Sequence, residues 1–245
     1  MQRVFFRLEY LVGVDIDRRA TPHTHHLRVQ RTARFYTLGG GSFAPRDVWF
    51  VLHGYGQLAD PFIRYFADLA NDDTLVVAPE AMNRFYLVSP EHAPARDRPV
   101  GATWITREDR DSEISDYVEY LDTLYDDVAL GPVREGARVN VLGFSQGAAT
   151  ATRWAAHGRA ILTRLVLWGG LLPPETDLSR GQASLRNARL TLVLGSRDRY
   201  VDATALAAER ARLDAAGIPY DVIEFEGGHA ISRAVFARLT GSSPA

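Results

Sequence analysis

The strongest constraint on the fold is a recurrence of short apolar segments, rich in β-branched residues, with helical patterns between them. The apolar segments span residues 47–54, 74–80, 138–144, 164–170, 189–196 and 220–228. Near-continuous hydrophobicity of this kind is typical of strands that are buried on both faces, as in a parallel sheet. Because strands that alternate with helices are joined by right-handed crossovers, the pattern predicts a doubly wound α/β fold with helices on both faces.

Three of the intervening segments have helical patterns, namely residues 111–128, 146–158 and 202–217. In the first, apolar residues recur at helical spacing and acidic residues occupy the opposite face. The other two end in glycine, which commonly follows the last turn of a helix.

Residues 26–38 have a different pattern, in which apolar and polar residues alternate. Leu27, Val29 and Phe35 lie on one side of this alternation and Arg28 and Arg34 on the other. This pattern predicts a half-solvated, antiparallel strand at the edge of the sheet. We find no repeat or linker, so residues 1–245 are interpreted as one domain, with residues 1–25 as an N-terminal extension or a further edge strand.

Length and charge limit the classes of partner. A chain of 245 residues with a net charge of −2 gives no sign of a nucleic-acid partner. The sequence has no apolar run of transmembrane length, which argues against membrane insertion. Arg7, Glu9 and Asp15 interrupt the apolar N-terminus, which makes it a poor signal peptide, so we expect a cytoplasmic protein.

Two missing residue types exclude several chemistries. The chain has no cysteine, which excludes thiol nucleophiles, disulfides and thiolate metal sites. All 28 basic residues are arginine, which excludes Schiff-base catalysis and a P-loop lysine. Nucleophilic catalysis in this chain would therefore use Ser, Thr, Asp, Glu, His or Tyr.

A candidate nucleophile lies in the pentapeptide Gly143-Phe144-Ser145-Gln146-Gly147, directly after a predicted strand and before a predicted helix. A sharp strand-to-helix turn holds such a serine in a strained backbone conformation, and small flanking residues avoid clashes. The alternative is a glycine-rich turn whose serine caps the helix. The position after a buried strand favours the nucleophile.

A serine hydroxyl needs a general base to become nucleophilic. In this architecture the base follows the serine in the chain, and only His157 and His229 do so. His157 lies about three turns along the helix that begins at Ser145, too far to reach back. His229, just after the last predicted strand, is therefore the candidate base; the alternative is a surface histidine that caps a helix.

The carboxylate that orients the base is expected in the loop after the strand at 189–196. Asp198 and Asp202 both lie there. Asp198 is closer to the end of the strand, whereas Asp202 has the position of an N-cap for the next helix, so Asp198 is preferred. Asp221 and Glu224 lie within a strand, away from the carboxyl edge where sites of open α/β folds form.

Stabilisation of an oxyanion requires two backbone N–H groups. One is expected from Gln146, the residue after the nucleophile, and the other from the loop at 52–57. The residues alone leave Gly54, Tyr55 and Gly56 as equal candidates for the second donor. His53 precedes them and is interpreted as a residue that braces the loop.

Other residues offer weaker signals. The three histidines in residues 22–26 suit no single helical face and lack nearby acids, so no metal site is expected. Aromatic and apolar residues near the expected site could line a substrate pocket, although core packing explains some of them equally well. These residues are Phe85, Tyr86, Trp104, Leu171 and Tyr200.

Four ordered motifs together resemble the phospholipase/carboxylesterase family of α/β-hydrolases, which includes acyl-protein thioesterases and small bacterial carboxylesterases. The motifs are LHGYGQ, GFSQGAA, GSRDRYV and GGHAI, and the resemblance spans residues 26–240. The resemblance implies a single-domain α/β-hydrolase fold with Ser145, Asp198 and His229 as a catalytic triad. It also implies Tyr55 as the second oxyanion donor, beside Gln146.

The sequence therefore predicts a serine carboxylesterase that cleaves small-molecule esters of short to medium acyl chains through an acyl-enzyme, with no cofactor, as a monomer or homodimer. A thioesterase or lysophospholipase would use the same machinery. Gln57 and residues 103–109 depart from the thioesterase branch, which weakens the case for lipidated-protein substrates. The alternative from outside the enzymes is a non-catalytic α/β-hydrolase domain that serves as a binding module.

Overall fold

The computed structural model describes residues 21–41, 45–87, 97–129, 136–178 and 183–241. The chain divides into two units, one ending at Thr32 and one beginning at Ala33. The described part of the first unit, residues 21–32, contains no helix or strand. Because residues 1–20 lie outside the described part, the expectation for residues 1–25 remains a prediction.

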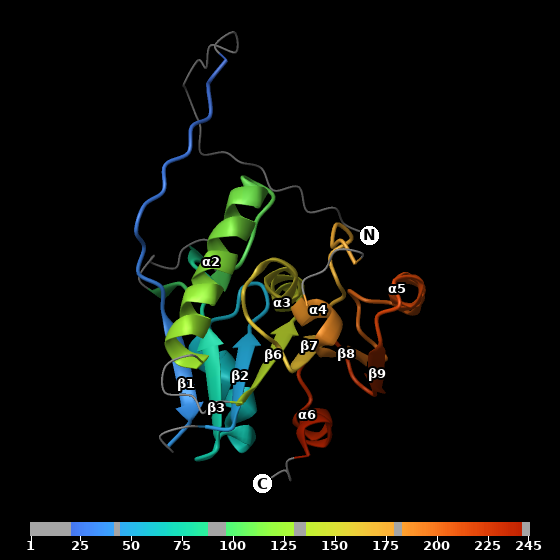
Figure 1. The fold of residues 1–245 in the computed structure, drawn as a ribbon. Coiled ribbons are helices and arrows are strands. Elements are labelled where there is room, and N and C mark those ends of the chain that lie inside the picture. The colour runs from blue at the N-terminus through green and yellow to red at the C-terminus, as the bar shows by residue number, and fades with distance from the viewer. Residues whose placement is uncertain (1–20, 42–44, 88–96, 130–135, 179–182, 242–245) are drawn as a thin grey trace. The chain divides into compact units, whose positions relative to one another are not determined.

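The second unit is built on a seven-stranded sheet of order β1-β3-β2-β6-β7-β8-β9 within its described residues (Figure 1). Every neighbouring pair is parallel except β1 with β3. The strands are β1 (Phe35–Gly39), β2 (Asp47–Leu52), β3 (Thr74–Pro79), β6 (Arg138–Phe144), β7 (Arg164–Trp168), β8 (Arg189–Gly195) and β9 (Tyr220–Phe225). The predicted fold class, a mostly parallel sheet with an antiparallel edge strand, is confirmed.

Helices cover both faces of this sheet. They are α1 (Ala59–Ile63), a 3-10 helix η1 (Arg64–Leu69), α2 (Arg110–Ala129), α3 (Gln146–His157), α4 (Ala183–Asn187), α5 (Ala203–Ala215) and α6 (Arg233–Thr240). The three predicted helices correspond to α2, α3 and α5. α1, η1, α4 and α6 were not predicted, because each is too short to show helical periodicity.

Two hydrophobic cores explain why the strands are apolar along their whole length. In β2, Phe50 packs into the core beneath α2 and α3, together with Trp154. The next residue, Val51, packs into the opposite core with Phe66 of η1 and Phe236 of α6. Because successive strand residues face opposite sides, a strand between two helical layers must be apolar at every position.

The predicted edge strand over residues 26–38 is only partly correct. β1 begins at Phe35, which pairs with Pro79, the last residue of β3, so the partner strand has ended before residues 26–34 could pair. The inward face is also the opposite of the predicted one. Tyr36 and Leu38 pack against the core, while Phe35 is exposed.

A second, two-stranded sheet was not predicted. It pairs β4 (Asn83–Tyr86) with β5 (Val100–Thr103) in antiparallel register. The sequence between these strands includes residues 88–96, which lie outside the described part. Neither strand is long enough to show alternation, and Gly101 weakens the pattern further.

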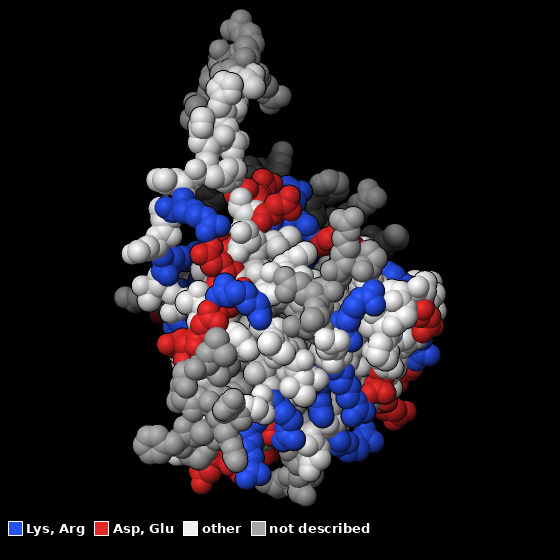
Figure 2. Space-filling model, viewed as in Figure 1, with Lys and Arg blue, Asp and Glu red and all other residues white. Residues whose placement is uncertain are grey.

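Charged side chains are mixed rather than separated by sign on the face shown in Figure 2. Arg159 pairs with Asp126 of α2, and Arg210 pairs with Glu224 of β9. None of the described helices is long and apolar enough to cross a membrane.

Candidate active site

Ser145 occupies a sharp turn between β6 and α3. Its φ is 55° and its ψ is −117°, and among described non-glycine residues only Asp109 shares a positive φ. A Cβ on Gly143 would lie 2.2 Å from the Gly147 carbonyl oxygen, and one on Gly147 would lie 2.2 Å from the Leu52 carbonyl oxygen. Glycine is thus required on both sides of the serine. The Ser145 side chain makes no capping hydrogen bond to α3, so the alternative of a helix cap is wrong.

Ser145, His229 and Asp198 form a continuous chain of hydrogen bonds. The Ser145 Oγ lies 2.8 Å from His229 Nε2, and His229 Nδ1 lies 2.7 Å from Asp198 Oδ2. A carboxylate can only accept, so Nδ1–H donates to Asp198 and Nε2 is free to accept the serine proton. The Asp198 side chain is 1% exposed, which shields this interaction from water.

The second oxygen of Asp198 holds the carboxylate in place. Its Oδ1 accepts from the Tyr200 N–H at 2.8 Å and from the Val201 N–H at 3.4 Å. Asp202, the alternative acid, instead accepts from the Ala205 N–H and caps α5. The structure therefore brings Asp198, and not Asp202, to His229.

The His229 imidazole is enclosed on several sides. The ring of Phe144 lies 4.9 Å from it and the ring of Tyr200 lies 4.5 Å from it, measured between centroids. Gly169 approaches from β7 with a φ of +61°, and a Cβ there would lie 3.0 Å from His229 Nδ1. These neighbours limit the orientations that the imidazole can adopt.

The loop after β2 lies against the serine. A Cβ on Gly54 would lie 3.2 Å from the Ser145 Cβ, and the Gly54 N–H donates to Gln57 Oε1 at 2.8 Å. Among the described residues, neither the Tyr55 N–H nor the Gln146 N–H donates a hydrogen bond within the protein.

His53 is a buried neutral brace for this loop. Its Nδ1–H donates to the Gly54 carbonyl at 2.8 Å, and its Nε2 accepts from the Ala81 N–H at 3.1 Å. An Nε2 that accepts cannot carry a proton, and burial lowers the pKa of His53 below its ordinary value. This contact pattern agrees with the interpretation of His53 as a bracing residue.

We expect acid to destabilise the protein through His53. The pKa of this residue is lowered in the folded state, so the unfolded chain binds a proton that the folded chain does not, and stability is lost as pH falls below the unfolded pKa of about 6.5. Urea midpoints measured from about pH 7.5 to about pH 5.5 should fall for the wild type. His53→Gln should be less stable throughout, with a smaller fall over the same interval. Equal falls in both proteins would contradict this account.

The five predicted pocket residues have different environments. Phe85 is partly buried, with its ring 5.1 Å from that of Tyr55, and Tyr86 is exposed. Tyr200 is exposed and stands over His229, while Leu171 packs against the core. Trp104 is a core residue: its side chain is buried, and its indole N–H donates to the carbonyl of His53.

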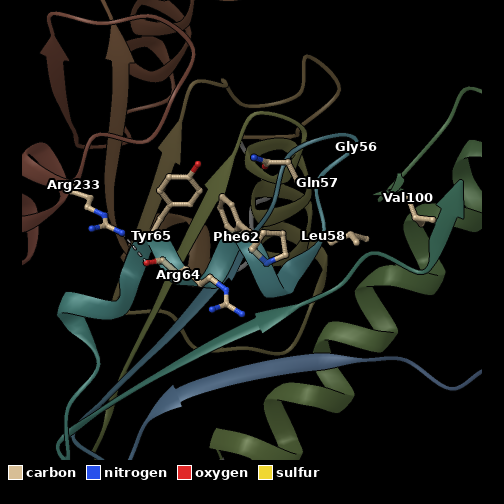
Figure 3. A pocket seen from close by; sticks show the side chains of 9 residues that line it. Gly56, Gln57, Leu58, Phe62, Arg64, Tyr65, Val100 and Arg233 are labelled. Atoms are coloured by element: carbon tan, nitrogen blue, oxygen red, sulfur yellow. Dashed lines mark hydrogen bonds between the residues drawn. The ribbon is translucent and has the colours of Figure 1, made fainter. Parts of the chain in front are cut away.

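A cavity of about 310 Å³ lies beside the loop that follows β2, residues 53–57 (Figure 3). Its walls come from Gly56 and Gln57, from α1 and η1, from β5 and from Arg233 of α6. None of the five predicted pocket residues lines it. Phe62 of α1 connects it to the site, since its ring stacks on Phe144, which in turn contacts His229. The sequence signal for this wall was the pair of aromatic residues Phe62 and Tyr65, three positions apart, as in a helix.

No group of three His, Asp or Glu side chains able to hold a metal ion occurs among the residues that the structure describes. The chemistry available at the site is that of a hydroxyl, an imidazole, a carboxylate and two free backbone N–H groups.

Comparisons with known proteins bear on the family and on the fold. Residues 44–241 match the model of the phospholipase/carboxylesterase family. The esterase PE8 structure is 23% identical, with a TM-score of 0.64 over 86% of this chain and 97% of that chain. A carboxylesterase from Mesorhizobium loti is 18% identical, with a TM-score of 0.65 over 85% of this chain and 94% of that chain. Acyl-protein thioesterase 2 from Zea mays is 18% identical, with a TM-score of 0.61 over 86% of this chain and 99% of that chain.

At these identities the structural likeness shows the fold alone, and no curated protein sequence matches the chain significantly. The family match, in contrast, covers most of the sequence, including the turn at Ser145 and the segment around His229. It supports a hydrolase of esters or thioesters and confirms the resemblance seen in the motifs. The chain belongs to the phospholipase/carboxylesterase family.

Proposed function

We propose that this protein is a serine hydrolase that cleaves small-molecule carboxylic esters through an acyl-enzyme intermediate on Ser145. The observation that carries the proposal is the unbroken hydrogen-bonded chain from the Ser145 Oγ through His229 to Asp198. The same arrangement of a serine, a base and an orienting acid recurs in nucleophilic hydrolases of unrelated folds, which supports the proposal.

The proposed reaction begins when the Ser145 Oγ attacks the ester carbonyl and His229 Nε2 takes the hydroxyl proton. Negative charge then develops on the carbonyl oxygen, where the N–H groups of Tyr55 and Gln146 would stabilise it. The intermediate collapses, the C–O bond to the alcohol breaks, and His229 returns its proton to the leaving oxygen. Water repeats the sequence on the acyl-enzyme and releases the acid.

Asp198 has two roles in this proposal. Its contact with Nδ1–H keeps the imidazole in the tautomer that can accept from Ser145, and its charge stabilises the imidazolium that forms. Nothing in these steps requires a metal ion or an organic cofactor.

We expect hydrolysis of 4-nitrophenyl esters with short and medium acyl chains, declining toward palmitate, because the cavity beside the loop is small compared with a long acyl chain. The measurement is kcat/KM across the series from acetate to palmitate. Failure to hydrolyse every ester and every matching thioester would contradict the proposal and favour a binding module.

A thioesterase is the second candidate, since one structural relative is an acyl-protein thioesterase and the carbonyl chemistry is shared. Acyl thioesters with the same acyl groups distinguish the two. A kcat/KM for the thioester at least about tenfold above that of the matched ester would assign the site to thioesters.

A further inference from the structure

We propose that residues 101–105, the end of β5 and the residues directly after it, hold both proposed oxyanion donors at a fixed separation. We call this segment the β5 bracket. The inference rests on the proposed function, because it assigns positioning roles to residues around the Tyr55 and Gln146 N–H groups.

The backbone of the β5 bracket is hydrogen-bonded to the loop that follows β2, residues 53–57, which carries the Tyr55 N–H. The Gly56 N–H donates to the Ala102 carbonyl at 2.9 Å, and the Ala102 N–H donates to the Gln57 carbonyl at 3.1 Å. These two bonds fix the chain immediately after Tyr55. They join the loop to β5.

Gly101 allows this close approach. A Cβ at position 101 would lie 2.4 Å from the Gly56 carbonyl oxygen and 2.7 Å from the Gly56 Cα. Both are backbone atoms, and Gly56 itself has a φ of +74°, a conformation that few other residues adopt. Any side chain at position 101 must therefore displace the loop that carries the Tyr55 N–H.

The β5 bracket also holds the other donor residue through its side chain. Gln146 Oε1 accepts from the Trp104 N–H at 3.0 Å. Gln146 Nε2 donates to the Ile105 carbonyl at 2.9 Å and to the Thr103 hydroxyl at 2.9 Å. An amide is needed here, because the Trp104 N–H requires an acceptor and the Ile105 carbonyl requires a donor.

A third contact reaches the start of the loop. The Trp104 indole N–H donates to the His53 carbonyl at 2.9 Å, and the buried indole ring lies 5.2 Å from the His53 ring. The β5 bracket thus contacts the loop both before Gly54 and after Tyr55, as well as Gln146.

One segment therefore sets the relative position of two N–H groups, one in the loop after β2 and the other at the first residue of α3. Oxyanion stabilisation depends on donors that are already in place, and displacement by about 1 Å can cost about a hundredfold in rate. Gly101 and the Gln146 side chain act as positioning groups, while the Tyr55 and Gln146 N–H groups are the ones that would touch the reacting oxygen.

The test compares Gly101→Ala and Gln146→Ala with the wild type, with rates normalised to the fraction of Ser145 that reacts with a fluorophosphonate. Gln146→Ala keeps the backbone N–H and removes only the tether. We expect kcat to fall about tenfold to a hundredfold in each variant, with little change in KM. Thr106→Ala, just beyond the β5 bracket and exposed, is the matched control and should retain wild-type kcat.

Two further readouts separate positioning from general damage. The pH dependence of kcat/KM, which reports the His229 base, should be unchanged. Affinity for a trifluoromethyl ketone, which forms an oxyanion on the serine, should weaken by the same factor as kcat/KM. If Gly101→Ala fails to fold, Gln146→Ala carries the test.

If the folded variants have the wild-type kcat after normalisation to the fraction of reactive Ser145, the inference is overturned. The proposed function would be unaffected by that result. A rise in KM at constant kcat would overturn the inference too. If Ser145→Ala retains esterase activity, the proposed function itself fails, which is a distinguishable result.

Discussion

Ser145→Ala is expected to lower kcat for ester hydrolysis by at least about a thousandfold. The substitution removes the only oxygen that lies within hydrogen-bond distance of His229 Nε2 among the described residues. It leaves the Tyr55 and Gln146 N–H groups in place, so a small residual rate above that in water is also expected. The measurement is steady-state hydrolysis of the best 4-nitrophenyl ester by both proteins.

Stability should not account for this loss. The Ser145 side chain makes no capping bond to α3, so its removal should change the free energy of unfolding little. Ser115→Ala, which alters an exposed serine of α2, is the matched control and should keep wild-type activity. Retention of more than about a tenth of the wild-type kcat in Ser145→Ala would rule out this serine as the nucleophile.

Asp198→Asn is expected to have the second large effect, a fall in kcat of about a thousandfold to ten-thousandfold. The Tyr200 and Val201 N–H groups both donate to Asp198 Oδ1, so an asparagine must place its carbonyl oxygen there. Its NH₂ group then faces His229 Nδ1. The imidazole must respond by protonating Nε2, which directs a hydrogen, rather than a lone pair, at Ser145.

Asp202→Asn provides the control for this second prediction. Asparagine caps helices about as well as aspartate, so α5 and the activity should both be preserved. A fall in kcat for Asp202→Asn that matched the fall for Asp198→Asn would show that the wrong carboxylate had been assigned. The kcat of Asp198→Asn should not recover at high pH, because the defect is one of tautomer and not of ionisation.

The sequence was sufficient to predict the sheet because burial dictates its pattern. Each interior parallel strand lies between two helical layers, so a strand such as β2 is apolar at successive positions and stands out locally. β1 lies at the edge, where only one neighbour constrains it. Its start at Phe35 depends on where β3 ends, which is a long-range property that alternation in residues 26–38 does not contain.

The positions of the candidate site residues could be predicted where those residues directly follow the ends of strands. Ser145, Asp198 and His229 each follow a parallel strand, so the carboxyl edge of the sheet brings them together. The choice between Asp198 and Asp202 could be made because Asp202 has the position of an N-cap. The triad roles themselves remain a proposal that the experiments above test.

The surroundings of the site were not predictable from local pattern. β4 and β5 are four residues each, and the hydrogen bonds of β5 to the loop after β2 join segments that are far apart in the sequence. Trp104 shows the difficulty: an aromatic residue near a site can line a pocket or brace a loop, and only its bond to the His53 carbonyl decides between them.

The most direct test of the account is to trap the acyl-enzyme. The wild type is mixed with 4-nitrophenyl butyrate, quenched in acid within the first turnovers and digested with trypsin, which cleaves after Arg138 and Arg153 and releases residues 139–153. The account predicts a butyryl group on Ser145 in this peptide, and none in Ser145→Ala. An unmodified peptide during active turnover, or a butyryl group on another residue, would contradict it.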